Sequence, residues 1–166
     1  MKSHAESRGI AGGPPASAAR PQGCTSFKLR QLTRRVGQHY DARLAEAGLK
    51  TTQYSLLSHV LKLGPVRPVD LAAAMTMDAS TLTRNLKPLV AAGWLEVGPG
   101  DDARSRRVRI TPAGAALRAQ AQRRWHAAQE SLNATLGPER VVALHDLIDQ
   151  SLALLASGAN GDDDDE

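Results

Sequence analysis

The sequence predicts a mainly α-helical protein that carries one small β-hairpin, an α+β fold in which helices dominate. Apolar residues recur at three- and four-residue steps along most of the chain, which is the pattern of amphipathic helices. Glycines and Gly-Pro pairs interrupt this pattern and mark expected helix ends at Gly48, Gly64-Pro65, Gly93 and Gly137-Pro138. Near residues 94–110 the pattern changes to two short alternating stretches around a loop rich in Gly and Asp, which indicates a hairpin.

The N-terminal part of the chain predicts two helices. Residues 25–47 carry an apolar stripe at helical spacing, and Gly48 follows as a helix-terminal residue. The stripe consists of Leu29, Leu32, Val36, Tyr40, Leu44 and Ala47. The second helix is expected to begin near Thr51 or Thr52, because either hydroxyl can cap it, and to end before Gly64.

The middle of the chain predicts two shorter helices. Pro68 suits the first turn of a helix that ends near Met75. Asp78 suits the cap of a following helix over residues 79–92. Pro88 falls inside that helix, where it is expected to introduce a kink or to end the regular part.

The C-terminal part predicts two long helices and an oligomer. Thr111-Pro112 combines a cap with a proline at the first helical position, and that helix is expected to reach about residue 136. A sixth helix is expected from the apolar spacing of residues 141–155. The helices at 25–47 and 112–157 are too long and too apolar to be covered by the small module at 51–111. A second subunit can cover them, so a symmetric homodimer is expected.

The two ends of the chain are expected to be disordered, with one domain over residues 23–157 between them. Residues 1–22 are small, polar and rich in Gly and Pro, and residues 158–166 end in five acidic side chains. The rest is basic, because 21 Lys and Arg exceed 17 Asp and Glu even when that acidic end is counted. A basic body favours a polyanionic partner.

Composition and motif content argue against several function classes. Cys24 is the single cysteine, so no intramolecular disulfide framework is possible, and the scattered histidines lack metal-ligand spacing. No metal or cofactor is therefore expected. The chain has no Cys-x-x-Cys pair, Gly-rich phosphate loop or nucleophile elbow, so no enzymatic activity is expected. No secretory signal and no run of about 18 apolar residues is visible, which predicts a cytoplasmic protein without membrane contact.

The helix over residues 79–92 carries the first functional signal. One face is expected to pack on the preceding helix through Leu82, Leu86, Leu89 and Val90. The polar face that remains is made of Ser80, Thr81, Thr83, Arg84 and Lys87. Short hydroxyls beside an arginine suit the base edges and phosphates of a DNA major groove, which is wide enough to admit a helix. The alternative is an ordinary solvated face. The preceding short helix and the four-residue turn 76–79 favour DNA recognition.

The hairpin carries the second signal, in four closely spaced arginines: Arg104, Arg106, Arg107 and Arg109. Val108 and Ile110 are expected to point inward, which directs Arg107 and Arg109 outward. Arg104 at the tip can enter the narrow minor groove, where guanidinium groups are attracted, and Asp102 is expected to orient it. We predict DNA contacts from Arg104, Arg106 and Arg107, with a solvated charged turn as the alternative.

Four segments, taken together in this order and spacing, resemble the multiple-antibiotic-resistance regulator (MarR) family. They are GLKTTQYSLL at 48–57, VDLAAAM at 69–75, DASTLTRNLKPLVAAGWL at 78–95 and DDARSRRVRITPAG at 101–114. The most diagnostic part is Asp102-x-Arg104 followed by Ile110-Thr111-x-x-Gly114. The resemblance implies a dimeric winged helix-turn-helix transcription regulator, expected to be a repressor, that binds an inverted-repeat operator in double-stranded DNA. It also implies that a small phenolic or anionic ligand, or thiol oxidation, releases the DNA, as in stress responses.

Cys24 is a candidate redox residue. It lies at the start of the first helix, where the helix dipole and the nearby Lys28 or Arg30 favour a thiolate. The alternative is an inert small side chain. The peroxide-sensing pattern of some family members is not matched, because Ser26 stands at the place of their cysteine and Thr51 at the place of one of their tyrosines.

Tyr40, Arg43, Tyr54 and His59 are candidates to line a ligand cleft between the dimer helices and the DNA-binding module, the region in which related proteins bind effectors. The alternative is that the tyrosines belong to the core and that the histidine is already hydrogen-bonded. Trp125 is expected to serve dimer packing.

Three functions remain to be compared. Sequence-specific transcription regulation is favoured by the polar helix face and the arginines of the hairpin. A peroxide-reducing thiol enzyme based on Cys24 has no second residue to support it. A winged helix that binds DNA without sequence preference, or that binds another protein, is the remaining alternative, since arginine-rich hairpins are compatible with it.

Overall fold

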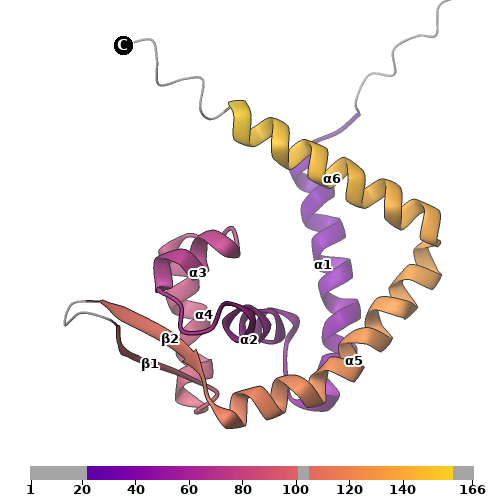
Figure 1. Cartoon of the computed structure of the whole chain (residues 1–166). Helices are drawn as coiled ribbons and strands as arrows, with labels where there is room; N and C mark the ends of the chain where they lie inside the picture. The colour runs from indigo at the N-terminus through magenta and orange to yellow at the C-terminus, as the bar shows by residue number, and fades with distance from the viewer. Residues whose placement is uncertain (1–21, 101–104, 159–166) are drawn as a thin grey trace, which may run out of the picture.

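The computed structural model describes residues 22–100 and 105–158 of the chain. It contains α1 (Thr25–Leu44), the 3-10 turn η1 (Ala45–Ala47), α2 (Thr51–Leu63), α3 (Pro68–Ala74), α4 (Ala79–Ala91), β1 (Leu95–Pro99), β2 (Arg106–Ile110), α5 (Pro112–Leu136) and α6 (Pro138–Gly158). In Figure 1, α2, α3, α4 and the β1–β2 hairpin gather on one side, while α1, α5 and α6 form an open frame beside them. The predicted mainly helical fold with one hairpin is confirmed.

The corner between α1 and α2 differs from the predicted helix cap. Gly48 ends η1 with a φ of 72°, a left-handed conformation that glycine adopts without strain. Lys50, rather than either predicted threonine, caps α2, and its backbone N–H donates to Gln53 Oε1 at 2.9 Å. Thr51 donates from its N–H and from its hydroxyl to Asp41 Oδ1, at 2.6 Å each. The carboxylate of Asp41 on α1 therefore holds the start of α2.

A tight turn joins α3 to α4. Thr76 in this turn has a φ of 50°, in the left-handed region that a β-branched residue rarely adopts. Two backbone hydrogen bonds keep the conformation, from Thr76 N–H to Ala73 O at 3.1 Å and from Met77 N–H to Ala72 O at 2.9 Å. The turn therefore contains local backbone strain at Thr76, and its conformation sets the direction in which α4 leaves α3.

Helix α4 buries its three predicted leucines but not the valine predicted with them. Leu82, Leu86 and Leu89 are buried in the core, whereas Val90 is 38% exposed. The helix continues through Pro88 to Ala91, so the proline does not end its regular part. The carbonyl of Pro88 still accepts the Ala92 N–H at 3.0 Å, which closes the last turn.

The hairpin is joined to the loop that precedes α3. Its strands pair antiparallel from Leu95 opposite Ile110 to Pro99 opposite Arg106. Val66 exchanges two backbone hydrogen bonds with Val108, at 3.1 and 2.8 Å. Because Val108 is fully buried, the hairpin is anchored to the same core that supports α4.

Thr111 and Gly114 form the junction between the hairpin and α5. The Thr111 hydroxyl accepts the Gly114 N–H at 3.0 Å and donates to Gly93 O at 2.7 Å. The Thr111 N–H donates to Trp94 O at 3.1 Å. A Cβ on Gly114 would lie 2.0 Å from Trp94 O, so this position requires glycine. The Ile-Thr-x-x-Gly pattern therefore locks the base of the hairpin onto α5.

The core lies among α2, α3, α4, the hairpin and the facing sides of α1 and α5. Its largest fully buried side chains are Leu44, Leu56, Leu57, Val60, Leu71, Leu82, Leu89, Leu95 and Val108. All of these except Leu44 belong to the segment 51–110. The compact module expected at 51–111 therefore has an apolar centre of its own.

Helices α1 and α6 leave apolar side chains in solvent. The exposed set consists of Phe27, Leu29, Val142, Leu147, Ile148, Leu152, Leu154 and Leu155. A largely apolar groove of about 490 Å³ runs between α1, α5 and α6. Despite this apolar surface, no helix among the described residues has the length and apolarity needed to cross a membrane.

Candidate nucleic-acid interface

The first turn of α4 is organised around the carboxylate of Asp78, which caps the helix as predicted. Asp78 accepts the Ser80 hydroxyl at 2.6 Å, the Thr81 hydroxyl at 2.7 Å and the Thr81 N–H at 2.7 Å. These bonds, and first of all the one from Ser80, hold the pKa of Asp78 well below its usual range. The carboxylate is therefore ionised at any physiological pH.

The five polar residues predicted on α4 lie together on its outer side, away from the buried leucines. Ser80, Thr83, Arg84 and Lys87 are exposed and Thr81 is half-buried. The Thr83 hydroxyl donates to Ala79 O at 2.8 Å, and Arg84 Nη2 donates to Thr81 Oγ1 at 3.2 Å. The face thus has fixed hydroxyls near its start and cations one turn later.

The predicted hairpin arginines that the structure describes differ in their contacts: one is exposed, and two donate hydrogen bonds to backbone carbonyls. Arg106 is exposed at the start of β2. Arg107 is half-buried and donates from Nη1 to Pro65 O at 3.2 Å, so it contacts the loop before α3. Arg109 donates from Nη2 to Pro99 O across the hairpin at 3.2 Å. Arg104 and Asp102, the predicted tip residues, lie outside the described residues.

Arg67 adds a cation that we did not predict. Its guanidinium forms a two-pronged ion pair with Asp70, Nε to Oδ2 and Nη2 to Oδ1, each at 2.7 Å. The hydrogen bond from Arg67 lowers the pKa of Asp70, and the charge of Arg107 lowers it further. An arginine three positions before an acidic residue in a first helical turn is a sequence signal that could have revealed this pair.

The candidate ligand residues are only partly brought together. Tyr40, Tyr54 and His59 line one pocket of about 340 Å³ among α1, α2 and α5, whereas Arg43 is exposed elsewhere on α1. Trp125 is half-buried within the subunit, and its expected role in dimer packing stays a prediction. Its ring stacks on Tyr54 with centroids 6.0 Å apart and planes inclined by 20°.

Several polar groups around this pocket already have partners, as the alternative interpretation predicted. The Tyr40 hydroxyl donates to Gln129 Oε1, and burial raises its pKa. His59 donates from Nδ1 to Ser55 O at 2.8 Å. Tyr40 is therefore a buried structural residue as well as a lining residue.

Arg118 of α5 is the principal pocket residue that we did not predict. It donates from Nε to Ser58 Oγ at 3.1 Å and from Nη1 to Gln122 Oε1 at 2.7 Å. Its guanidinium carbon lies 5.5 Å from the centre of the Tyr54 ring, a cation–π distance. Arg118, Gln122 and Trp125 recur at helical spacing, a signal that could have placed them on one face of α5.

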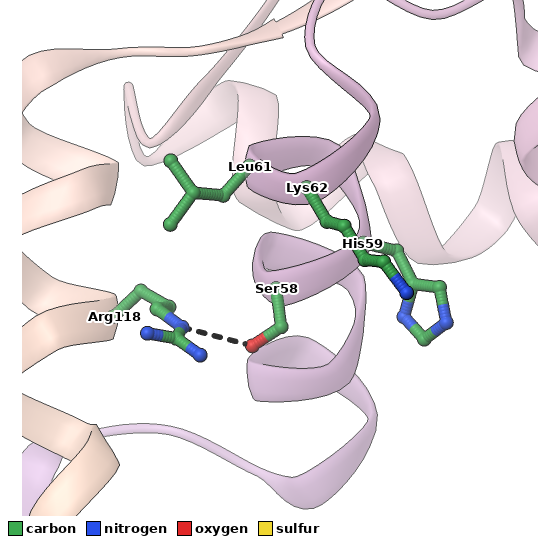
Figure 2. Close-up of a pocket in the computed structure, with 5 residues that line it drawn as sticks. All are labelled: Ser58, His59, Leu61, Lys62 and Arg118. Carbon is green, nitrogen blue, oxygen red and sulfur yellow. Dashed lines mark hydrogen bonds between the residues drawn. The ribbon is translucent and has the colours of Figure 1, made fainter.

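A second pocket of about 420 Å³ adjoins the first and shares Ser58, His59 and Arg118 with it. Figure 2 shows Arg118 reaching from α5 toward Ser58 on α2, with Lys62 and His59 on the other side of α2. The two pockets together form a surface with an aromatic floor and cationic edges.

Cys24 is exposed and occupies the cap position of α1. Its carbonyl accepts the Lys28 N–H at 3.1 Å, and Arg30 Nη2 donates to Ser26 Oγ at 3.1 Å. The thiol is therefore accessible, and its redox role stays a prediction.

Comparison with known proteins decides the family. Residues 47–105 match the sequence model of the MarR family. The multiple antibiotic resistance protein MarR of Salmonella typhimurium is 30% identical to this chain over 134 residues, which cover 80% of this chain and 91% of that protein. The chain belongs to the MarR family.

Solved structures share the MarR-family fold. The transcriptional regulator MosR of Mycobacterium tuberculosis, in a crystal structure with DNA, has a TM-score of 0.68 and 30% sequence identity, over 80% of this chain and 98% of that one. A mutant of MarR from Escherichia coli complexed with operator DNA has a TM-score of 0.71 over 76% of this chain and 92% of that one. At 24% identity the latter likeness concerns the fold alone. The predicted winged helix-turn-helix architecture is confirmed.

Proposed function

We propose that this protein is a sequence-specific DNA-binding transcription regulator that inserts α4 into the major groove and acts as a repressor. The observation that carries the proposal is the division of α4 into a buried leucine face and an exposed face of hydroxyls and cations. A major groove accepts a helix with such an outer face, and Arg84 and Lys87 supply charge for phosphates and base edges. The exposed Arg106 and the ion-paired Arg67 lie on neighbouring segments of the same module.

We further propose that two copies bind an inverted repeat. The apolar groove between α1, α5 and α6, with the exposed leucines of α6, supports a second subunit as its cover. A symmetric dimer presents two copies of α4, and such dimers read half-sites about 34–36 Å apart. With DNA as its partner, the protein is further proposed to act in the cytoplasm.

Competition between DNA sequences tests the regulator proposal. The promoter region upstream of the protein's own gene should compete for binding far better than random DNA of the same length. Arg84→Ala should reduce that preference, whereas Arg123→Ala, which removes an equal charge from the exposed side of α5, should not. Equal affinity for promoter and random DNA, governed by salt alone, would favour the alternative of non-specific binding.

A small anionic or phenolic effector is proposed to bind the paired pockets between α2 and α5. Tyr54 and Trp125 offer an aromatic surface, and Arg118 and Lys62 lie at its edges. Salicylate is the probe: it should quench the tryptophan fluorescence, to which Trp94 and Trp125 both contribute, and weaken promoter binding in wild type. Both effects should shrink in Arg118→Ala and persist in Arg124→Ala, whose arginine pairs with Glu46 away from the pockets.

Oxidation of Cys24 is the second predicted route of release, supported by its exposure. Organic peroxide should weaken promoter binding by wild type and leave Cys24→Ser unaffected. Equal loss of binding in both proteins would assign the effect to another residue.

A further inference from the structure

Helix α4, which is predicted to recognise DNA, carries three hydroxyl groups, and all three donate their hydrogens to acceptors inside the protein. Ser80 and Thr81 donate to the Asp78 carboxylate at 2.6 and 2.7 Å, and Thr83 donates to Ala79 O at 2.8 Å. An ionised carboxylate and a carbonyl oxygen accept hydrogen bonds and cannot donate them, so the direction of all three bonds is fixed. Toward DNA, the three hydroxyl oxygens therefore present only their remaining lone pairs, so they can accept hydrogen bonds but not donate them.

We propose that Asp78 determines part of the DNA specificity by turning Ser80 and Thr81 into obligate acceptors, so that the first turn of α4 selects base edges that carry a donor. In the major groove these are the amino groups of adenine and cytosine. Guanine and thymine edges present acceptors at the corresponding positions, and two facing acceptors repel. This inference rests on the proposed function, because it assumes that α4 lies in the major groove.

The same arrangement disfavours phosphate as the partner of this turn. Phosphate oxygens are acceptors, so a hydroxyl whose hydrogen is already donated to Asp78 cannot bind them. The negative charge of Asp78 adds repulsion at the same place. The first turn of α4 is thus fitted to neutral base edges, which carry sequence information, rather than to the backbone.

Arg84, one turn later on α4, is a hydrogen-bond donor, in contrast to the hydroxyls of the first turn. Its Nη2 donates to Thr81 Oγ1 at 3.2 Å, which leaves the rest of the guanidinium fork free to donate outward. The backbone positions of Thr81 and Arg84 lie about 4.5 Å apart along the helix axis, and their side-chain groups are in direct contact. The outer face of α4 therefore presents an acceptor, the Thr81 hydroxyl, followed closely by a donor, the Arg84 guanidinium. A guanidinium fork matches the acceptors of guanine.

Asp78→Asn tests the inference because it keeps the cap and changes the polarity. Asparagine caps helices about as well as aspartate, and its oxygen can still accept the Thr81 N–H. Its amide NH₂ is a donor, so one hydroxyl, that of Thr81 or of Ser80, must accept from it and turn its hydrogen outward. Thr81→Ala and Ser80→Ala identify the base pair that each hydroxyl contacts. Glu96→Gln, which removes the same charge at an exposed position of β1, is the matched control.

The experiment selects preferred sites from DNA pools randomised around the promoter site, with thermal unfolding of each protein as a check on folding. At the base pairs that Thr81→Ala and Ser80→Ala make indifferent, the strand on which wild type selects adenine or cytosine is taken as the contacted strand. Asp78→Asn should shift one of these positions toward guanine or thymine on that same strand, while Glu96→Gln keeps the wild-type preference. An Asp78→Asn protein with an unchanged preference overturns the inference and leaves the proposed function intact.

A measurement on wild type alone covers the case in which Asp78→Asn does not fold. Promoter DNA in which the exocyclic amino group is removed from the selected adenine or cytosine should bind about threefold to tenfold more weakly, as expected for one hydrogen bond. Unchanged affinity overturns the inference. A wild type that selects no sequence from the pool overturns the proposed function together with it.

Discussion

Replacement of Gly114 by alanine tests the junction that orients the hairpin. A Cβ at this position would lie 2.0 Å from Trp94 O and 2.8 Å from Trp94 C, and both are backbone atoms that cannot rotate away. Overpacking of this kind costs roughly 1–3 kcal/mol. If the added Cβ pushes the hairpin strands away from α5, the hydrogen bond from Thr111 N–H to Trp94 O is also weakened. That bond contributes about 1 kcal/mol to stability.

Helix propensity acts in the opposite direction, since alanine is favoured over glycine by up to about 1 kcal/mol. We therefore expect Gly114→Ala to lower the free energy of unfolding by about 1–3 kcal/mol. Urea unfolding followed by circular dichroism measures this, at one protein concentration because dimerisation adds to stability. Ala116→Gly, on the exposed side of the same helix, is the control and should cost about 1 kcal/mol. A Gly114→Ala protein as stable as wild type would refute the close approach.

Three further predictions concern the turn, the dimer and the cap. Thr76→Gly should raise the free energy of unfolding by about 0.5–1 kcal/mol, because it removes left-handed strain at a φ of 50°; Thr76→Ala, which keeps a Cβ, should give no such gain in the same urea titration. Leu152→Asp should leave the helical circular dichroism intact and halve the mass measured by sedimentation, since this side chain is 57% exposed on α6 in the isolated subunit; an unchanged mass would argue against this dimer surface. Because the folded state lowers the pKa of Asp78, its contribution to stability is present above the unfolded value of about 4 and is lost as the pH falls. Wild type should therefore lose more stability than Asp78→Asn between about pH 5 and pH 3 in parallel urea titrations; equal losses would contradict the assignment.

Local features of the sequence predicted the helices of the DNA-binding module well. Asp78 and Thr111 cap α4 and α5 as predicted, because a cap depends on residues within one turn of each other. The leucine spacing of α4 likewise placed its buried face, since burial follows the helical period. The same helical period assigns the hydroxyls and cations of α4 to its outer face.

Features that depend on distant segments were not predictable in this way. The start of α2 is held by Asp41, ten residues away, so the threonine cap expected from local rules is wrong. Arg118 contacts Ser58 across sixty residues, and nothing near Arg118 in the sequence points to that partner. The stacking of Trp125 on Tyr54 likewise joins two residues that are far apart in the sequence.

Hydroxyl-radical footprinting on the promoter tests the central claim most directly. A dimer that inserts two copies of α4 should protect two segments whose centres lie about 10 base pairs apart on one face of the duplex. Arg84→Ala should lose this pattern at a protein concentration at which Arg123→Ala retains it. A single protected segment, or equal protection on DNA of unrelated sequence, would contradict the account.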